Sequence, residues 1–153
     1  MDILQSTKTH HRFLKKATRN ISQVGDYFPN FLIQEGKYIQ ELISDHLIIV
    51  ALSTTCYPCK NAMQVLLDFL SENYNANLVI LFSADSNEDF EHISELIGDK
   101  AKLFRMEITK LMSYFQGVPW GITLNIKGQI LSSYPFDNRY WFDKIIIPVI
   151  KII

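Results

Sequence analysis

Two uninterrupted runs of apolar residues stand out along the chain. Leu47–Leu52 (LIIVAL) and Leu78–Phe82 (LVILF) are short, and neither alternates with polar positions. A continuous apolar run of this length is typical of a strand that is buried on both faces of a sheet. We therefore predict two such strands, with Leu47–Leu52 as the central one.

The pattern changes to a helical period after each run. Beyond the first run a helix is predicted that starts at or just after the two cysteines and ends near Asn73. Its apolar positions are Met63, Leu66, Leu67 and Leu70. A second helix is predicted from Ser86, a capping residue followed by acidic residues, to about Ile97, where Gly98 stops it.

Shorter elements are predicted in the second half of the chain. An edge strand and a short helix are expected at Lys102–Met106 and Ile108–Phe115. Val118–Ile126 and Gln129–Tyr134 are joined by Lys127-Gly128, which predicts an antiparallel hairpin with a tight turn. Asn138 to about Ile147 is expected to form a last helix that covers the sheet.

The order of the predicted elements defines the fold class. Gly25–Lys37 and Tyr38–Ser44 mix aromatic with turn residues and predict a short hairpin or irregular layer before the first buried strand. Strand, helix, strand, helix, hairpin and helix then follow one another. This order indicates an α/β layer architecture with mixed strand directions.

Length and charge narrow the class of protein. The chain has 153 residues, of which 48% are hydrophobic, which suits one compact domain. With 15 basic and 16 acidic residues it is nearly neutral, so no global field for nucleic acid or membrane is implied. We expect a domain over residues 25–153, a basic extension over residues 1–24, and no nucleic-acid partner.

The two ends of the chain predict no membrane span. The extension lacks the apolar core of a signal peptide, which favours a cytoplasmic location. Its basic residues are Lys8, Arg12, Lys15, Lys16 and Arg19. Such a stretch forms either a solvated terminal helix or a weak contact with an anionic membrane surface. Ile145–Ile153 is far shorter than the ~20 residues of a spanning helix, so we expect it to pack on the core.

The two cysteines stand together between the first predicted strand and its helix, as Cys56-Tyr57-Pro58-Cys59. At a helix N-terminus the positive end of the helix favours a thiolate, so Cys56 is the expected nucleophile. Cys59, one turn later, can attack a mixed disulfide on Cys56 and is the expected resolving thiol. Pro58 suits the first turn of a helix, where a backbone N–H would be unpaired.

Other roles for the pair require partners that the sequence does not supply. Two cysteines in one motif cannot build a disulfide-stapled secreted scaffold. A zinc site would need two further ligands, and the histidines show no paired spacing, so no metal is expected. These histidines are His10, His11, His46 and His92. A structural disulfide or two inert core cysteines remain open, but the strand before, the helix after and the internal proline favour redox chemistry.

Three segments between Gly25 and Trp141 resemble one known family. They are the leading segment GDYFPNF, the LIIVAL strand with CYPCK, and Gly117-Val118-Pro119 opening a strand that turns at Lys127-Gly128. This pattern resembles the thioredoxin superfamily, and within it the bacterial proteins of cytochrome c maturation and related thiol-disulfide oxidoreductases, the TlpA-like and AhpC/TSA-related branch.

The resemblance implies a thioredoxin-like fold, with a central mixed β-sheet flanked by helices, and disulfide exchange without a cofactor. It implies that Pro119 is a cis-proline beside the Cys56 sulfur, and that the backbone of Val118 pairs with an extended partner segment. Tyr57, Val118 and Trp120 are expected to form an apolar docking patch. The implied partners are a disulfide-bearing protein or peptide and a reductant or redox partner protein, in keeping with cell redox homeostasis.

The chain departs from this family pattern in three places. Thr55 stands where many relatives carry Trp, LIIVAL lacks a buried Asp, and Lys60–Met63 contains no acid. Deprotonation of Cys59 would then rely on water or on another group such as Lys60. This predicts a slower or more specialised exchange enzyme than a general thioredoxin.

Two rival functions remain open at this stage. A peroxiredoxin-like peroxidase would use Cys56 in a pattern of Pro, three residues, Ser or Thr, two residues and Cys. Ser53 fits that pattern, but Ile49 occupies the proline position and Cys59 is unusually close for a resolving cysteine. The other rival is a non-enzymatic thioredoxin-fold module that binds a partner with the Pro119 face and leaves the dithiol idle.

Overall fold

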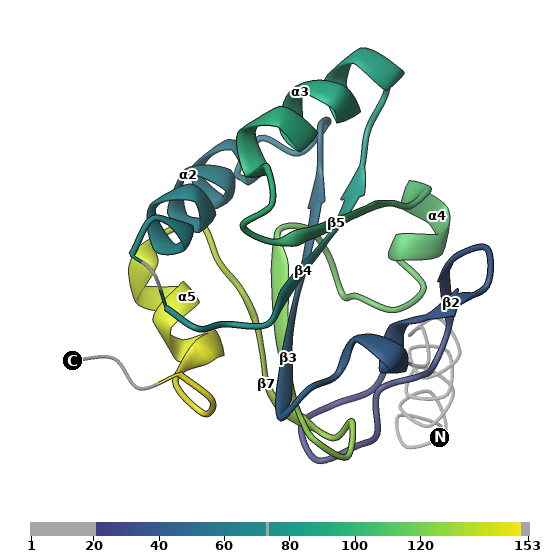
Figure 1. The fold of residues 1–153 in the computed structure, drawn as a ribbon, viewed down its shortest axis with the longest axis vertical. Coiled ribbons are helices and arrows are strands. Elements are labelled where there is room, and N and C mark those ends of the chain that lie inside the picture. The colour runs from purple at the N-terminus through teal and green to yellow at the C-terminus, as the bar shows by residue number, and fades with distance from the viewer. Residues whose placement is uncertain (1–20, 73, 151–153) are drawn as a thin grey trace, which may run out of the picture.

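The structure is a computed structural model that describes residues 21–72 and 74–150 (Figure 1). The elements in chain order are β1 (Leu32–Gln34), β2 (Lys37–Tyr38), the 3-10 helix η1 (Ile39–Leu42), β3 (His46–Ser53), α2 (Cys59–Leu70), β4 (Leu78–Ser83), α3 (Asn87–Ile97), β5 (Lys102–Arg105), α4 (Ile108–Leu111), β6 (Trp120–Asn125), β7 (Ile130–Pro135) and α5 (Arg139–Ile146). The basic residues of the N-terminal extension lie outside the described part, and so does the membrane-surface contact predicted for them.

Within those residues, five strands form a mixed sheet in the order β5-β4-β3-β6-β7. β3 pairs in parallel with β4 and antiparallel with β6, while β5 and β7 are the edges. All eight residues of β3 are buried, because both faces of the sheet are covered. The predictions of a central strand at Leu47–Leu52 and an edge strand at Lys102–Met106 are therefore confirmed.

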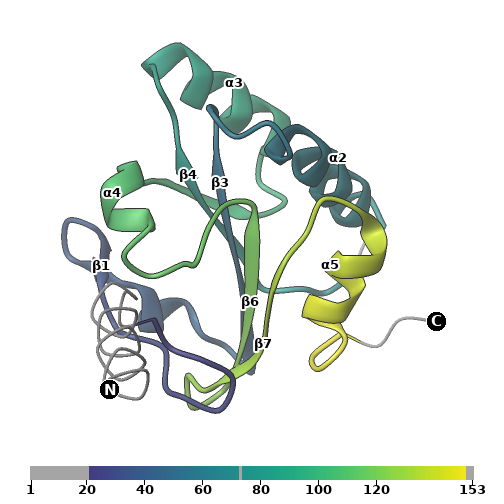
Figure 2. The same cartoon turned by 180° about the vertical axis from the view of Figure 1, so that it is seen from behind.

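Helices α2, α3 and α5 cover one face of the sheet (Figures 1 and 2). The other face is covered by the leading segment, by η1 and by α4, around Phe28, Phe31 and Phe115. Alternate residues of β3 point to opposite faces of the sheet. Those that face the three helices are Ile48, Val50 and Leu52. Those that face the other side are Leu47, Ile49 and Ala51. This double burial explains why the strand reads as a continuous apolar run.

Caps fix where two of these helices begin. The Ser86 side chain accepts a hydrogen bond from the Asp89 backbone N–H at the start of α3, and Asn138 accepts one from the Trp141 backbone N–H at the start of α5. Each satisfies a backbone donor that has no partner within the helix. Both predicted helix starts are confirmed, and α3 ends before Gly98, as predicted.

The leading segment forms a short antiparallel hairpin of β1 and β2, as predicted, followed by a 3-10 helix. The helix predicted over Ile108–Phe115 is shorter, because α4 ends at Leu111 and the chain continues in turns. These turns bring the Phe115 ring against Phe28, with centroids 5.9 Å apart.

Helix α5 is tied to the hairpin of β6 and β7 by Ile145. Its side chain packs against Gly121, where an added Cβ would lie 2.6 Å from Ile145 Cδ1. Its carbonyl oxygen, one of the last in the helix and so without a helical partner, accepts hydrogen bonds from the buried hydroxyls of Thr123 and Ser132. The absence of a side chain at Gly121 thus lets α5 lie close to β6.

The C-terminal segment packs as predicted where it is described. Ile145, Ile146 and Ile150 are buried in the core beneath α5, whereas Ile147 is exposed. Residues 151–153 lie outside the described part. Among the described residues, none of the helices combines the length and the apolar character that a membrane span requires.

Candidate active site

The Cys56-Tyr57-Pro58-Cys59 motif lies where the central strand passes into α2. β3 ends at Ser53, Cys56 lies in the following turn, and Cys59 is the first residue of α2. The two cysteines form a disulfide, with their Cα atoms 5.3 Å apart. The pair therefore lies at the end of the central strand, where α2 begins.

The two cysteines differ in exposure. Cys59 is buried, with 5% of its surface exposed, and belongs to the core beneath α2. Cys56 is partly exposed, and Tyr57 beside it is 84% exposed. An incoming disulfide can therefore reach Cys56 but not Cys59.

The start of α2 carries the polarity that a thiolate needs. Pro58 occupies the N-cap position with helical backbone angles, and its carbonyl oxygen accepts a hydrogen bond from the Ala62 N–H at 3.1 Å. The first turn of α2 contains no acidic residue. The positive end of the helix therefore faces the dithiol without a compensating carboxylate in that turn.

A loop distant in sequence closes one side of the dithiol. The peptide bond between Val118 and Pro119 is cis, and the two residues lie just before β6, which begins at Trp120. The Val118 carbonyl oxygen is 3.4 Å from Sγ of Cys56. This contact brings the segment that precedes β6 next to the dithiol.

An apolar groove of about 640 Å³ runs beside the dithiol. Its lining residues are Pro58, Gly117, Val118, Pro119, Trp120, Tyr134, Pro135, Phe136, Asp137 and Trp141. Trp120 is held in place because its Nε1–H donates to Ser133 Oγ at 2.8 Å. Tyr134 and Trp141 are 37% and 40% exposed, and their rings contact each other, with centroids 5.8 Å apart. Within its lining, the groove has aromatic walls and one carboxylate, Asp137.

The groove combines predicted residues with others that the sequence did not single out. Pro58, Val118, Pro119 and Trp120 all line it, whereas Tyr57 lies outside its lining. Tyr134, Asp137 and Trp141 were not predicted as site residues. No spacing rule connects them to the dithiol, because only the return of β7 along β6 and the start of α5 bring them there.

A second cavity, of about 370 Å³, lies on the other side of the dithiol, between α2 and α3. Both cysteines line it. The remaining lining residues are Ser53, Thr54, Lys60, Met63, Gln64, Leu67, Phe82, Asp89, His92, Ile93 and Leu96. The dithiol thus separates an apolar groove from a cavity that carries ionisable side chains.

The Ser53 hydroxyl forms hydrogen bonds with Thr55 in the turn after β3. Its hydroxyl oxygen lies 2.9 Å from Thr55 Oγ1 and accepts the Thr55 backbone N–H at 3.2 Å. Ile49, at the position where a peroxiredoxin would carry proline, is fully buried in β3 and pairs with Val79 and Ile122 on either side. A proline would lack the N–H that a strand paired on both sides uses.

Comparison with solved structures identifies the fold. The chain is similar to the thioredoxin domain of a thiol-disulfide oxidoreductase from Bacteroides vulgatus, with 13% identity, a TM-score of 0.59, and 79% of this chain and 95% of that chain covered. It is similar to a thiol:disulfide interchange protein from Bacteroides sp., with 12% identity, a TM-score of 0.60, and 82% and 91% covered. It is also similar to a peroxiredoxin-like protein from Aquifex aeolicus, with 10% identity, a TM-score of 0.58, and 78% and 80% covered.

These likenesses concern the fold, because fewer than one residue in six is identical. The chain has a thioredoxin-like α/β fold, and the predicted fold class is confirmed. A scan against family models and a search of curated proteins find no match. At the level of the fold, the structural neighbours include thiol-disulfide oxidoreductases.

Proposed function

We propose that the protein is a thiol-disulfide oxidoreductase that exchanges disulfides with a protein or peptide partner. Cys56 is the nucleophile and Cys59 the resolving thiol. The observation that carries the proposal is the asymmetry of the pair: Cys56 is partly exposed beside the Val118 carbonyl, while Cys59 is buried behind it within bonding reach. One sulfur is accessible to a partner, and the other can only reach its neighbour.

The exchange proceeds in two balanced steps. The Cys56 thiolate attacks one sulfur of a partner disulfide, which forms a mixed disulfide and releases the other partner sulfur as a thiolate that takes up a proton. Cys59 then loses its proton and attacks Cys56 Sγ, which forms the Cys56–Cys59 disulfide and releases the second partner thiol. A dithiol reductant or redox partner protein restores the reduced pair by the same chemistry in reverse.

The backbone beside the dithiol supports an extended partner. Pairing between β6 and β3 begins at Trp120, so Val118 precedes the paired part of the strand and can contact an added segment. Such pairing recognises main chain and tolerates varied sequences. Pro119, in the cis form, holds this segment next to Cys56 as a positioning residue.

The groove defines the chemistry of the partner segment. Its aromatic walls suit a bulky apolar side chain close to the partner cysteine, because burying such a side chain is favourable. Asp137, the one carboxylate in its lining, complements a basic residue. The proposed substrate is therefore an extended, disulfide-bearing segment with an aromatic or large aliphatic residue and a basic residue near the cysteine.

The proposal is tested with a Cys59→Ser variant and a synthetic disulfide peptide that carries Phe and Lys beside its cysteine. We expect a stable mixed disulfide through Cys56, detected by mass spectrometry, because the resolving thiol is absent. Cys56→Ser is the matched control and should form no adduct. A Cys59→Ser protein that forms no adduct with this peptide or with a small disulfide reagent contradicts the proposed exchange.

The same variant separates the rival functions. A peroxiredoxin-like enzyme should form a sulfenic acid on Cys56 with hydrogen peroxide even without Cys59. We expect little peroxide consumption, since the Ser53 hydroxyl is engaged by Thr55. Rapid sulfenic acid formation would favour the peroxidase, and an unreactive Cys56 would favour the non-enzymatic binding module. The cytoplasmic location remains a prediction.

A further inference from the structure

The second step of the proposed exchange requires Cys59 to lose a proton in an unfavourable place. Cys59 is 5% exposed and packs against apolar core residues. Burial in such surroundings disfavours the charged thiolate. The first turn of α2 contains no acidic residue. A proton acceptor for Cys59 must therefore come from another element that shares its cavity.

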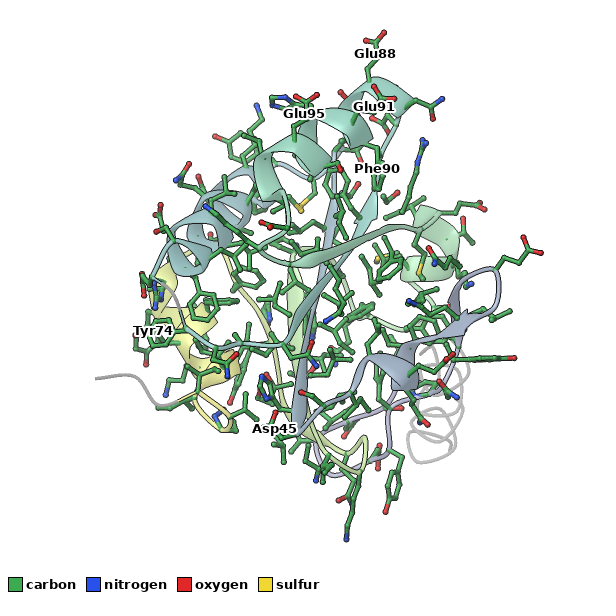
Figure 3. The ribbon with its side chains drawn as sticks, viewed as in Figure 1. Asp45, Tyr74, Glu88, Phe90, Glu91 and Glu95 are labelled. Atoms are coloured by element: carbon green, nitrogen blue, oxygen red, sulfur yellow. A yellow bond between two sulfur atoms is a disulfide. The ribbon has the colours of Figure 1, made fainter. Side chains whose placement is uncertain are left out.

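The cavity between α2 and α3 brings such groups to Cys59. The α3 residues that line it are spaced as one helix face: Asp89, His92, Ile93 and Leu96. The ionisable side chains along the cavity are those of the two cysteines, Lys60, Asp89 and His92. Figure 3 shows the glutamates Glu88, Glu91 and Glu95 of α3, and none of them lines the cavity.

Helices α2 and α3 come from neighbouring strands. α2 follows β3 and α3 follows β4, and the two strands are parallel. Both helices therefore start from the end of the sheet that carries the cysteines. The cavity between them is lined by Lys60, Met63, Gln64 and Leu67 of α2 and by Asp89, His92, Ile93 and Leu96 of α3. Cys59 and His92 thus share a cavity whose lining is both polar and apolar.

We propose that His92 accepts the proton of Cys59 through water in this cavity, an inference that rests on the proposed function. A cavity of about 370 Å³ has room for water, and polar side chains in its lining can hold that water. Neutral imidazole accepts a proton near physiological pH, whereas a lysine ammonium has no lone pair to do so. Asp89 lies one turn earlier on the same face of α3 and lines the same cavity.

The proposed step transfers one proton and exchanges one disulfide bond for another. The Cys59 S–H proton passes through water to an imidazole nitrogen of His92, and the Cys59 thiolate attacks Cys56 Sγ. The Cys56–Cys59 bond forms, the bond from Cys56 to the partner sulfur breaks, and the electron pair leaves with the partner thiolate. The proton then passes from the imidazolium to solvent or to the leaving thiolate, which restores neutral His92.

A two-phase measurement tests the role of His92 apart from the proposed function. Reduced protein is mixed with the chromogenic disulfide dithionitrobenzoate in a stopped-flow instrument. The first released thionitrobenzoate reports attack by Cys56, and the second reports resolution by Cys59. We expect His92→Gln to slow the second phase about tenfold or more near neutral pH, within the range of general base catalysis, and to leave the first phase unchanged. Glu95→Gln, on α3 but outside the cavity, is the matched control.

Two further readouts exclude a merely structural effect. The logarithm of the second-phase rate should show an inflection with pH in the wild-type protein that His92→Gln lacks, and added imidazole should restore much of the lost rate. A second phase that is unchanged in His92→Gln, or one that is slowed but keeps the wild-type pH profile and does not respond to imidazole, overturns the role of His92. Failure of wild-type protein to give a first phase contradicts the proposed function instead.

Discussion

The carbonyl oxygen of Val118 lies 3.4 Å from Sγ of Cys56, although the two residues are 62 positions apart in the chain. The contact exists because β6 runs antiparallel to β3 and begins level with its end, where Trp120 pairs with Ala51. The chain before β6 is thereby held against the turn that follows β3. A segment that pairs with Val118 would therefore lie close to the sulfur of the partly exposed Cys56.

Trp141 is predicted to set preference for a partner without affecting the chemistry. Replacing it with Ala removes a wall of the groove, so the KM for a disulfide peptide with Phe beside its cysteine should rise about tenfold, equivalent to ~1.4 kcal/mol of lost apolar contact. The rate with a small disulfide reagent should stay unchanged. Ile126→Ala, which removes a 66% exposed side chain outside the groove, serves as control. An equal loss with both substrates would contradict a docking role.

Gly121 is predicted to be required by the close approach of α5. Gly121→Ala places a methyl group 2.6 Å from Ile145 Cδ1, and overpacking of this kind costs about 1–3 kcal/mol. Ile145→Val removes Cδ1 and should cost about 0.5–1.5 kcal/mol alone. In urea unfolding, the double variant should be less destabilised than the sum of the two. Additive losses would show that the two residues do not compete for this space.

His46 is predicted to stabilise the end of the sheet away from the dithiol. This buried side chain accepts the Asn77 backbone N–H at Nε2 (3.0 Å) and donates from Nδ1 to Asp45 (2.7 Å). Asp45 lies at the opposite end of the molecule from α3 (Figure 3). His46→Phe leaves the Asn77 N–H without this acceptor and should lower the free energy of unfolding by about 1–3 kcal/mol. Asp45→Asn, at an exposed carboxylate, should change it by less than about 0.5 kcal/mol.

The ion pair of Glu72 with Arg139 is predicted to make stability depend on pH. Hydrogen bonds from the guanidinium hold the pKa of Glu72 below its ordinary 4.5. Because this pKa is lower in the folded state, the stabilisation is complete above about pH 4.5 and is lost as the pH falls through the lowered value. Both side chains are about a third exposed, so the contribution stays below about 1 kcal/mol.

Urea midpoints measured at neutral pH and at about pH 3 check this dependence. Glu72→Gln should lower the midpoint at neutral pH and have a smaller effect in acid, so that its two midpoints lie closer together than those of the wild-type protein. Glu95→Gln provides an exposed control on another helix. A Glu72→Gln loss that is equally large at both pH values would show that the ion pair is not its cause.

The sequence predicted those parts of the fold whose signal is local. Leu47–Leu52 could be identified as a central strand because burial on both faces leaves no polar position, and the α3 start because Ser86 is followed by acidic residues. The end of α4 could not be predicted, since it depends on the contact of Phe115 with Phe28, 87 positions earlier. Burial of one aromatic ring against another overrode the local helical pattern.

The residues of the candidate site also fall into those that the sequence could predict and those that it could not. Cys56 and Cys59 are adjacent in one motif, and Pro119 could be proposed from family resemblance. Trp141 and His92 carry no such signal, because only the packing of α5 and α3 against the sheet brings Trp141 into the lining of the groove and His92 into the lining of the cavity. An exposed aromatic residue or histidine in a helix is common, and its place in such a lining becomes visible only in three dimensions.

The hydrogen bonds from the Thr123 and Ser132 hydroxyls to the carbonyl oxygen of Ile145 affect how the groove binds a partner. They fasten the helix that carries Trp141 to the two strands that carry Trp120 and Tyr134. The aromatic residues that line the groove therefore stand on elements that are tied together by hydrogen bonds, which preorganises the groove before a partner arrives. Binding then loses little conformational entropy on the protein side, and most of that entropic cost falls on the partner, which favours segments that are already extended.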